Sequence, residues 1–382
     1  MKRTGFGIAT ALTLVAGLST QSGQGLQAQA QESQALTLQF SQVDAQSTAS
    51  YWTADRLAAA QPLRPIPAIA PRTEFERQAQ GTPQGAAGSA PSLSVQAARN
   101  PLYNPASVKI EAERAAESIV QPNDEGTFHA PYTSSRVTPL SADLKYPYRA
   151  AGKLFFTIPG QGDFVCSASV IQRRIVATAG HCVHSGSGGA AGFHANFLFV
   201  PAFRDGNAPL KAWRWSFAVV TGTWATGGGA VPNAADYAML EVADKTFDGV
   251  YRRIGEITGW LGWQTLSLER NHTTKLGYPC NIDSCQKMHQ ELSNNFRNTS
   301  PNNVEYGSHS RGGSSGGPWI QNFGSAGVGQ TGGLNPGSNR VVGITSYGYV
   351  STDPKVQGAS ILDNRWVKIF NIACAHRAGN CS

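Results

Sequence analysis

The sequence has few charged side chains, which make up 14% of its 382 residues, whereas about 25% is usual in soluble proteins. Cysteine is absent before Cys166, and no segment after the N-terminal 30 residues approaches the ~20 consecutive apolar residues of a membrane-spanning helix. Acidic residues are too few for an acidic solvating chain, and the glycines lack the regular spacing of collagen. These shortages exclude a collagen-like protein and one with a transmembrane helix in its body.

The charge that is present is unevenly distributed. Residues 1–136 contain 10 basic and 10 acidic side chains, whereas residues 137–382 contain 21 and 14, so the whole net charge of +7 lies in the second part. The 42 glycines and 21 prolines favour short strands and turns over long helices. We therefore expect residues 1–136 and 137–382 to differ in structure and role rather than to form one homogeneous domain.

Residues 1–30 have the features of an export signal. Lys2 and Arg3 precede a mostly apolar stretch at 6–18, and the small-x-small sequence AQA ends at Ala30. The apolar stretch is too short to span a bilayer. We predict cleavage after Ala30, no membrane anchor after processing, and an extracellular or periplasmic destination where disulfides persist. The alternative is an uncleaved amphipathic N-terminus.

Residues 31–136 are rich in Gln, Ala, Ser and Pro and show neither strand alternation nor a sustained apolar stripe, apart from one possible helix at 104–118. Such a composition rarely buries enough apolar surface to fold alone. In an exported protein we interpret it as a poorly structured pro-region, with a flexible spacer as the alternative.

Residues 137–382 form a unit large enough to bury roughly 70–75% of its unfolded surface. Short apolar runs recur between Gly, Pro and Asn residues, which predicts an all-β sandwich or barrel. A C-terminal helix is expected at 364–373. The runs lie at 153–158, 164–171, 175–178, 197–200, 216–220, 237–242, 265–268, 273–278, 290–292, 318–321, 341–347 and 359–362.

All six cysteines lie in this second part, and proximity along the chain suggests three disulfides. The competing interpretation is a zinc site built on His181, Cys182 and His184. Structural zinc sites favour Cys-x-x-Cys pairs, which the spacings here do not match, so no metal is expected. The expected pairs are Cys166–Cys182, Cys280–Cys285 and Cys374–Cys381.

Three short motifs together indicate nucleophilic catalysis. The sequence GGSSGGP surrounds Ser315, where glycines allow close approach of a substrate backbone and leave N–H groups for an oxyanion. The sequence TAGHC places His181 just after an apolar strand, and DYAML opens another strand with Asp236. Each motif alone is common. A base, an orienting carboxylate and a nucleophile in one chain are the parts of a Ser-His-Asp mechanism.

In these motifs the chain resembles the trypsin/chymotrypsin superfamily of serine endopeptidases, and within it the bacterial glutamyl endopeptidase branch. The sequences YPYRA, PAFRDG and GYP are weaker echoes of that branch, and the resemblance covers about residues 136–372. It implies two six-stranded antiparallel β-barrels with the active site between them. His181 and Asp236 would come from the first barrel and Ser315 from the second, with the N–H groups of Gly313 and Ser315 as the oxyanion hole.

The resemblance also implies polypeptide substrates, a monomer and no cofactor. It places the pocket for the residue before the scissile bond around Thr345, Ser346 and Gly348. In glutamyl endopeptidases the position of Thr345 is a histidine that binds the substrate carboxylate. His309 stands where the pocket floor lies in the trypsin pattern, and we consider it as a replacement cation. A preference for acidic residues is therefore a hypothesis.

The activation of such an enzyme is also open. Trypsin-like animal enzymes have an aspartate at the position of Ser314, and it pairs with the new N-terminal ammonium. Ser314 carries no charge, so that switch does not operate here in the same way. Two maturation sites are considered, the Arg136–Val137 bond and a bond near Gly126.

Three other functions are alternatives. A non-catalytic protease homologue that binds partners usually lacks one of the three residues, and all are present. A GxSxG esterase needs an Asp and a His after the serine in a parallel sheet, but the one His that follows, His376, lies between two cysteines. Nucleic-acid binding needs basic residues among aromatics, and the WRW sequence at 213–215 is the sole such cluster, so we expect no nucleic-acid partner.

Overall fold

The computed structural model describes residues 34–39, 47–48, 50–63, 86–88, 130–324, 337–349 and 355–381. The predicted export signal at 1–30, the possible helix at 104–118 and the maturation site near Gly126 lie outside these residues. Contacts divide the chain into a short unit, Met1–Gln31, and a unit from Glu32 to Ser382 that contains every element described below.

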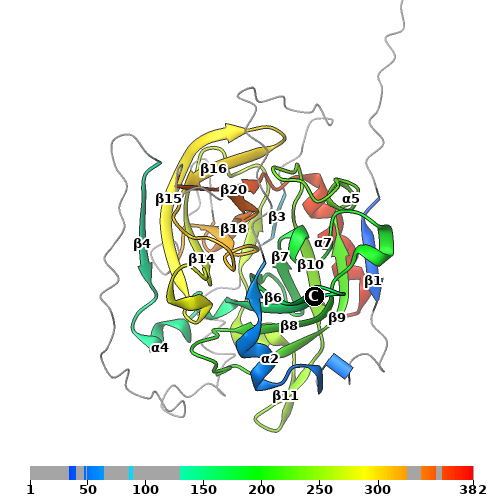
Figure 1. Ribbon diagram of the computed structural model, residues 1–382. Coiled ribbons are helices and arrows are strands. Elements are labelled where there is room, and N and C mark those ends of the chain that lie inside the picture. Colours follow the sequence, from blue (N-terminus) through cyan, green and yellow to red (C-terminus); the bar gives the residue numbers. More distant parts are fainter. Residues whose placement is uncertain are drawn as a thin grey trace, which may run out of the picture. The chain divides into compact units, whose positions relative to one another are not determined.

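Six antiparallel strands form a closed barrel in the first half of the predicted enzyme domain (Figure 1). Closure comes from pairing of β8 with both β5 and β9. The apolar runs make these strands because their side chains fill the barrel interior and pack outward against neighbouring elements. The strands are β5 (Ala151–Ile158), β6 (Gly162–Val170), β7 (Ile175–Thr178), β8 (Ala195–Pro201), β9 (Trp213–Val220) and β10 (Ala238–Val242).

A second sheet follows in the sequence, and most of its strands are also antiparallel (Figure 1). Among the described residues, hydrogen bonds close the first sheet into a barrel. Within these residues the second sheet has two ends, because β19 at one end does not pair with the strands at the other end, where β13 adds to β18 in parallel. The strands are β13 (Gly262–Gln264), β14 (His272–Gly277), β15 (His289–Thr299), β16 (Asn303–Gly307), β17 (Pro318–Gln321), β18 (Arg340–Ile344), β19 (Tyr347–Gly348) and β20 (Val356–Ser360).

The fold class predicted from the sequence is confirmed: antiparallel sheets dominate and the long helix is C-terminal. Helix α7 (Asn364–His376) begins after Asp363, whose side chain accepts a hydrogen bond from the N–H of Arg365. Its buried face, which includes Trp366, packs back onto β9 and β10 of the first barrel. None of the helices in the described ranges is long and apolar enough to cross a membrane.

The remaining elements are short. After β10 the chain forms an antiparallel hairpin of β11 (Lys245–Phe247) and β12 (Val250–Arg252). The short α-helices are α2 (Ala54–Ala59), α4 (Leu140–Asp143), α5 (Gly222–Ala225) and α6 (Ile254–Thr258), and the 3-10 turns are η2 (Tyr148–Ala150), η3 (Gly180–Cys182), η4 (Gly189–Gly192) and η5 (Asp283–Cys285).

The described stretches of the predicted pro-region add strands to both sheets. They gain backbone hydrogen bonds at sheet edges that would otherwise be exposed. These stretches are thus structured through their pairing with the two sheets, which their composition did not indicate. The strands are β1 (Leu36–Gln39) on β9, β2 (Gln61–Pro62) on β6, β3 (Ala87–Gly88) on β13 and β4 (Tyr132–Arg136) on β15.

Candidate active site

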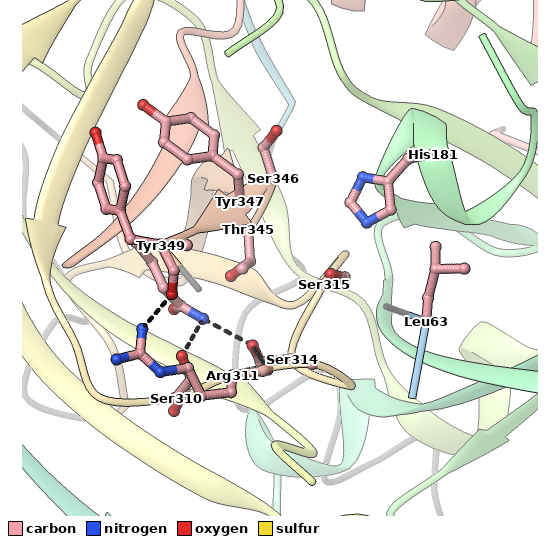
Figure 2. A pocket seen from close by; sticks show the side chains of 13 residues that line it. Leu63, His181, Ser310, Arg311, Ser314, Ser315, Thr345, Ser346, Tyr347 and Tyr349 are labelled. Carbon is pink, nitrogen blue, oxygen red and sulfur yellow. Dashed lines mark hydrogen bonds between the residues drawn. The ribbon is translucent and has the colours of Figure 1, made fainter. Parts of the chain in front are cut away.

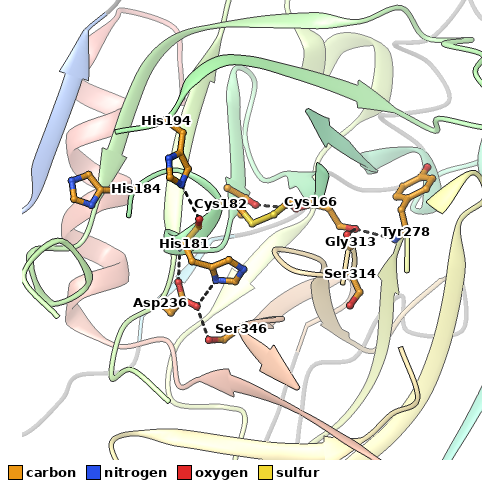
Figure 3. Close-up of a disulfide and its surroundings, with 12 residues drawn as sticks. Cys166, His181, Cys182, His184, His194, Asp236, Tyr278, Gly313, Ser314 and Ser346 are labelled. Carbon is orange, nitrogen blue, oxygen red and sulfur yellow. Dashed lines mark hydrogen bonds and ion pairs between the residues drawn. A yellow bond between two sulfur atoms is a disulfide. The ribbon is translucent and has the colours of Figure 1, made fainter. Parts of the chain in front are cut away.

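The first barrel holds His181 and Asp236 together. His181 lies in the η3 turn directly after β7, and Asp236 precedes β10. Since β7 and β10 pair antiparallel, with Thr178 opposite Ala238, the two residues meet at one end of the barrel. Nδ1 of His181 lies 2.7 Å from Oδ2 of Asp236, and the N–H of His181 donates to Oδ1 at 2.8 Å (Figure 3).

Asp236 is completely buried, so its carboxylate depends on hydrogen-bond donors. Ser346 Oγ donates to Oδ2 at 2.6 Å, and Ser346 is also one of the residues expected from the sequence to line the pocket. An ionised carboxylate only accepts hydrogen bonds, which places the imidazole proton on Nδ1 and leaves Nε2 as the free base. Sequence reasoning missed this contact, because no local signal links positions 110 residues apart.

Ser315 lies in a turn of the second sheet that only glycines permit at two positions. Gly313 has φ +93°, and a Cβ there would lie 2.5 Å from the carbonyl oxygen of Tyr278. Gly316 has φ +81°, and its Cβ would lie 2.1 Å from Oγ1 of Thr178. The Gly-rich sequence therefore lets the turn pack directly against the first barrel, which brings Ser315 to the same pocket as His181 (Figure 2).

Ser167 of β6 joins this turn to the first barrel. Its N–H donates to the carbonyl oxygen of Ser315 at 2.7 Å, and its Oγ donates to that of Gly313 at 2.8 Å. The same Oγ accepts the N–H of Tyr278 at 2.9 Å. Among the described residues, the N–H groups of Gly313 and Ser315 have no acceptor, as an oxyanion hole requires.

The pocket next to Ser315 contains three of the four residues predicted to bind the substrate side chain: Thr345, Ser346 and Gly348. Gln357 forms part of the wall, because its Nε2 donates to the carbonyl oxygen of Ser310 at 3.2 Å and to Oγ of Ser314 at 2.7 Å. Figure 2 shows Tyr347 and Tyr349 on one side of Ser315 and His181 on the other.

The prediction that His309 supplies a cation to this pocket is corrected by its position. His309 does not line the pocket. Its ring stacks on Tyr132 of β4, and Nδ1 lies 3.2 Å from Oε1 of Glu291. Burial alone would raise the pKa of Glu291. Nζ of Lys275 lies 3.1 Å from Oε2 of Glu291, and this ammonium, together with His309, holds the pKa of Glu291 well below its usual range. His309 thus pairs with a buried carboxylate, which the sequence did not reveal, and lies outside the pocket lining.

Arg311 is the permanently charged side chain among the described residues that line the pocket. Its Nη1 donates to the carbonyl oxygen of Tyr349 at 3.0 Å, which orients the guanidinium along the pocket wall. Sequence reasoning overlooked Arg311, although it is four residues before Ser315 and follows His309 by two.

The structure forms the three disulfides that sequence proximity predicts, Cys166–Cys182, Cys280–Cys285 and Cys374–Cys381. The first joins β6 to the turn that carries His181 (Figure 3). Cys182 is thus no free thiolate for a zinc ion, and Nε2 of His184 lies 2.7 Å from the carbonyl oxygen of Gly189.

Burial lowers the pKa of nearby His194 to about 4, so that ring stays neutral in ordinary buffers.

No model of a known protein family matches the chain, and no curated protein sequence matches it. Among solved structures, it is similar to the protease Anisep from Arthrobacter nicotinovorans, with 25% identity over 63% of this chain and 99% of that chain and a TM-score of 0.49. The chain is also similar to AL20, a thermostable serine protease from an extremophilic microorganism, with 26% identity over 63% of this chain and 100% of that chain and a TM-score of 0.49. A third similar structure is a Glu endopeptidase in complex with MPD, with 18% identity over 64% of this chain and 97% of that chain and a TM-score of 0.47.

Proposed function

We propose that this chain is a secreted serine endopeptidase, made as a preproenzyme and acting as a monomer on polypeptides. The observation that carries the proposal is the buried Asp236–His181 pair beside Ser315, with the N–H groups of Gly313 and Ser315 left for an oxyanion. The antiparallel sheets also disfavour the esterase alternative, which needs a parallel α/β sheet. WRW at 213–215 lies in β9 with both tryptophans buried, so it serves packing rather than nucleic-acid binding.

In the proposed mechanism, Nε2 of His181 removes the proton from Ser315 as its Oγ attacks the substrate carbonyl. The N–H groups of Gly313 and Ser315 stabilise the oxyanion of the tetrahedral intermediate, and one such donor typically contributes about 100–1,000-fold in turnover. His181 then protonates the leaving amine, which yields an acyl-enzyme on Ser315. Asp236 keeps the ring oriented and stabilises the imidazolium, and water releases the acyl group by the same steps.

The direct test replaces the nucleophile. Ser315→Ala is expected to abolish cleavage of a denatured protein, because the proposed acyl-enzyme forms on this hydroxyl, whereas the hydroxyls of Ser314 and Ser346 already donate to the carbonyl oxygen of Arg311 and to Asp236. Cleavage is measured by gel electrophoresis, with reaction of a fluorophosphonate as an independent assay of the serine. Ser314→Ala is the matched control and should retain labelling. Full cleavage by Ser315→Ala would refute the proposal, and an intact, unlabelled wild-type protein would favour the non-catalytic alternative.

We propose further that the pocket prefers an acidic side chain before the scissile bond, with Arg311 rather than His309 as the cation. A buried or half-buried guanidinium pairs well with a carboxylate. Arg311→Met should lower kcat/KM for a peptide with Glu at that position by about tenfold or more, the equivalent of one charge-assisted hydrogen bond. Peptides with Leu there should change little, and Lys287→Met, outside the pocket, should leave both rates unchanged. A peptide-library profile dominated by Arg, Leu or Ala would reject this preference.

The structure bears on where the pro-region is removed. The side chain of Arg136 pairs with Asp283, with Nε 2.8 Å from Oδ2, and Val137 is 1% exposed. Burial would raise the pKa of Asp283, but Arg136 and His289 hold it at about 2, so the pair persists in ordinary buffers. A protease needs an accessible, extended bond, which Arg136–Val137 does not offer here. We therefore favour the upstream alternative near Gly126, which assigns β4 to the mature enzyme.

A further inference from the structure

A described stretch of the predicted pro-region enters the candidate active site. β2 pairs with β6 so that Pro62 lies opposite Val165. The next residue, Leu63, lines the pocket together with His181 and Ser315. Contact with the Gly-rich turn is close, since a Cβ on Gly312 would lie 3.1 Å from Cβ of Pro62 and 3.2 Å from the carbonyl oxygen of Leu63.

Leu63 occupies the side of Ser315 where a leaving group departs. Figure 2 shows it beside His181, on the opposite side of Ser315 from Tyr347 and Tyr349. In the proposed mechanism the acyl half of a substrate fills the pocket near those tyrosines, and the leaving amine extends toward His181, which protonates it. A segment at Leu63 therefore excludes the C-terminal half of a substrate.

The segment also runs in the direction opposite to a substrate. β2 is parallel to β6, and β6 runs toward Ser167, which contacts the carbonyl oxygen of Ser315. The segment therefore approaches Ser315 from N- to C-terminus. The chain of a bound substrate on this side would lead away from Ser315 in the N- to C-terminal direction, because its C-terminal half is the leaving group. With reversed polarity, the peptide bonds beside Leu63 are not presented to Ser315 for acyl transfer.

The preceding residues anchor the segment to the first barrel. Trp52 is 9% exposed, packs against Phe155 at 5.7 Å between ring centroids, and donates Nε1–H to the carbonyl oxygen of Asn196 at 2.6 Å. Tyr51 donates its hydroxyl to Asp163 at 2.6 Å. Arg56 of α2 pairs with the same carboxylate at 3.1 Å, which fixes α2 directly before β2.

We propose that Gln61–Leu63 is an inhibitory strap: it blocks the leaving-group side of the active site in an orientation that resists cleavage, and the Trp52 anchor holds it there until the pro-region is removed. This inference rests on the proposed serine endopeptidase function. It assigns a specific inhibitory role to residues that composition alone describes as a poorly structured pro-region or, in the alternative, as a flexible spacer.

The test measures how fast Ser315 reacts in the uncleaved chain. The probe is a fluorophore-tagged peptidyl diphenyl phosphonate, whose phenoxy groups need the leaving-group side, and a denaturing gel separates uncleaved from processed protein. The uncleaved band should label at least about tenfold more slowly than the processed band, as expected if the strap is bound at least about 90% of the time. Trp52→Ala and Leu63→Ser should each raise the rate of the uncleaved band.

Asp55→Ala, an exposed position on α2, is the matched control and should leave the rate unchanged. Leu63→Ser keeps the anchor, so it tests the strap even if Trp52→Ala misfolds. Equal labelling of the two wild-type bands would overturn the strap and leave the proposed enzyme intact. Absence of labelling in the processed band would instead refute the enzyme function. Peptide mapping in which the first cut falls beside Leu63 would overturn the reversed orientation.

Discussion

At the scale of single residues, the molecule keeps several ionisable groups buried, and each has a local physical reason. Asp236 is fully buried because His181 and Ser346 supply its donors. Lys153 of β5 is 1% exposed, and its Nζ donates to the carbonyl oxygen of Cys285 at 3.0 Å. Nζ also lies 4.5 Å from the ring centroid of Phe203. No described carboxylate pairs with it, so its charge is stabilised only by dipoles and rings.

Lys153 predicts a pH-dependent stability. Burial lowers its pKa to about 8, below its usual value of 10.5. Between these values the unfolded chain keeps a proton that the folded chain has lost, so this group makes stability rise with pH through that window. Lys153→Met should be more stable than the parent at pH 7, by about 1–3 kcal/mol, with the difference shrinking toward pH 10.

The measurement for Lys153 is urea unfolding at pH 7, 8.5 and 10, made in Ser315→Ala protein to prevent self-digestion. Lys145→Met is the control, because that lysine is exposed and its removal should not alter the pH dependence. A parallel pH dependence in Lys153→Met and the parent would contradict the prediction.

At the scale of elements, the polar strand β16 supports the pocket. Glu305 is fully buried and accepts hydrogen bonds from Arg297 at 2.6 Å, Tyr347 at 2.9 Å and Tyr349 at 2.7 Å. Burial, with the neighbouring carboxylate, raises the pKa of both phenols, so they remain protonated donors. Since both tyrosines line the pocket, Glu305 fixes the pocket wall from behind.

Removal of this carboxylate should affect binding more than chemistry. Glu305→Ala leaves Arg297 and two tyrosine hydroxyls without this acceptor, at a cost of about 1–3 kcal/mol of unfolding free energy. We expect KM to rise by a larger factor than kcat falls, since the wall moves while His181 and Ser315 remain in place. Steady-state kinetics and urea unfolding are the measurements. Glu305→Gln, which keeps the shape and an acceptor, should lose less, and a selective fall in kcat would contradict this role.

At the scale of the whole molecule, the candidate active site depends on how the two sheets are joined. Ser167 of the first barrel donates two hydrogen bonds to the turn of Gly313 and Ser315 in the second sheet, and its Oγ accepts a third from the N–H of Tyr278. Thr178 also donates to the carbonyl oxygen of Ser167 at 2.9 Å. The placement of Ser315 relative to His181, the proposed nucleophile and base, therefore depends on contacts across the junction and not within one sheet.

Ser167→Ala tests this junction. The loss of one Oγ leaves the carbonyl of Gly313 and the N–H of Tyr278 unpaired in a buried site, which should cost about 1–3 kcal/mol of stability. We also expect kcat to fall at least about tenfold, because small displacements of a nucleophile reduce rates strongly. Ser169→Ala is the matched control: it lies on the same strand, is buried, and its Oγ has no hydrogen-bond partner among the described residues. Equal effects of the two variants would refute the role of Ser167.

The strands of the first barrel could be predicted because their apolar runs are nearly continuous and end at Gly, Pro or Asn. The prediction of 175–178 coincides with β7, and that of 153–158 lies within β5. β16 and the second half of β15 were missed, since their sequences are polar and rich in Asn. These strands depend on buried pairs such as Arg297–Glu305, which appear only when distant segments meet.

The sequence by itself determined the class of fold and the candidate residues His181, Asp236 and Ser315, because strand periodicity and the glycines of a tight turn are local properties. The tertiary structure alone decided that His309 turns to a buried glutamate, that Arg311 lines the pocket and that Leu63 lies in the same pocket as Ser315. The uneven charge indicated the bounds of the predicted enzyme domain but not the place of its pocket. Burial and pairing of charges depend on segments far apart in the chain, and no local pattern encodes them.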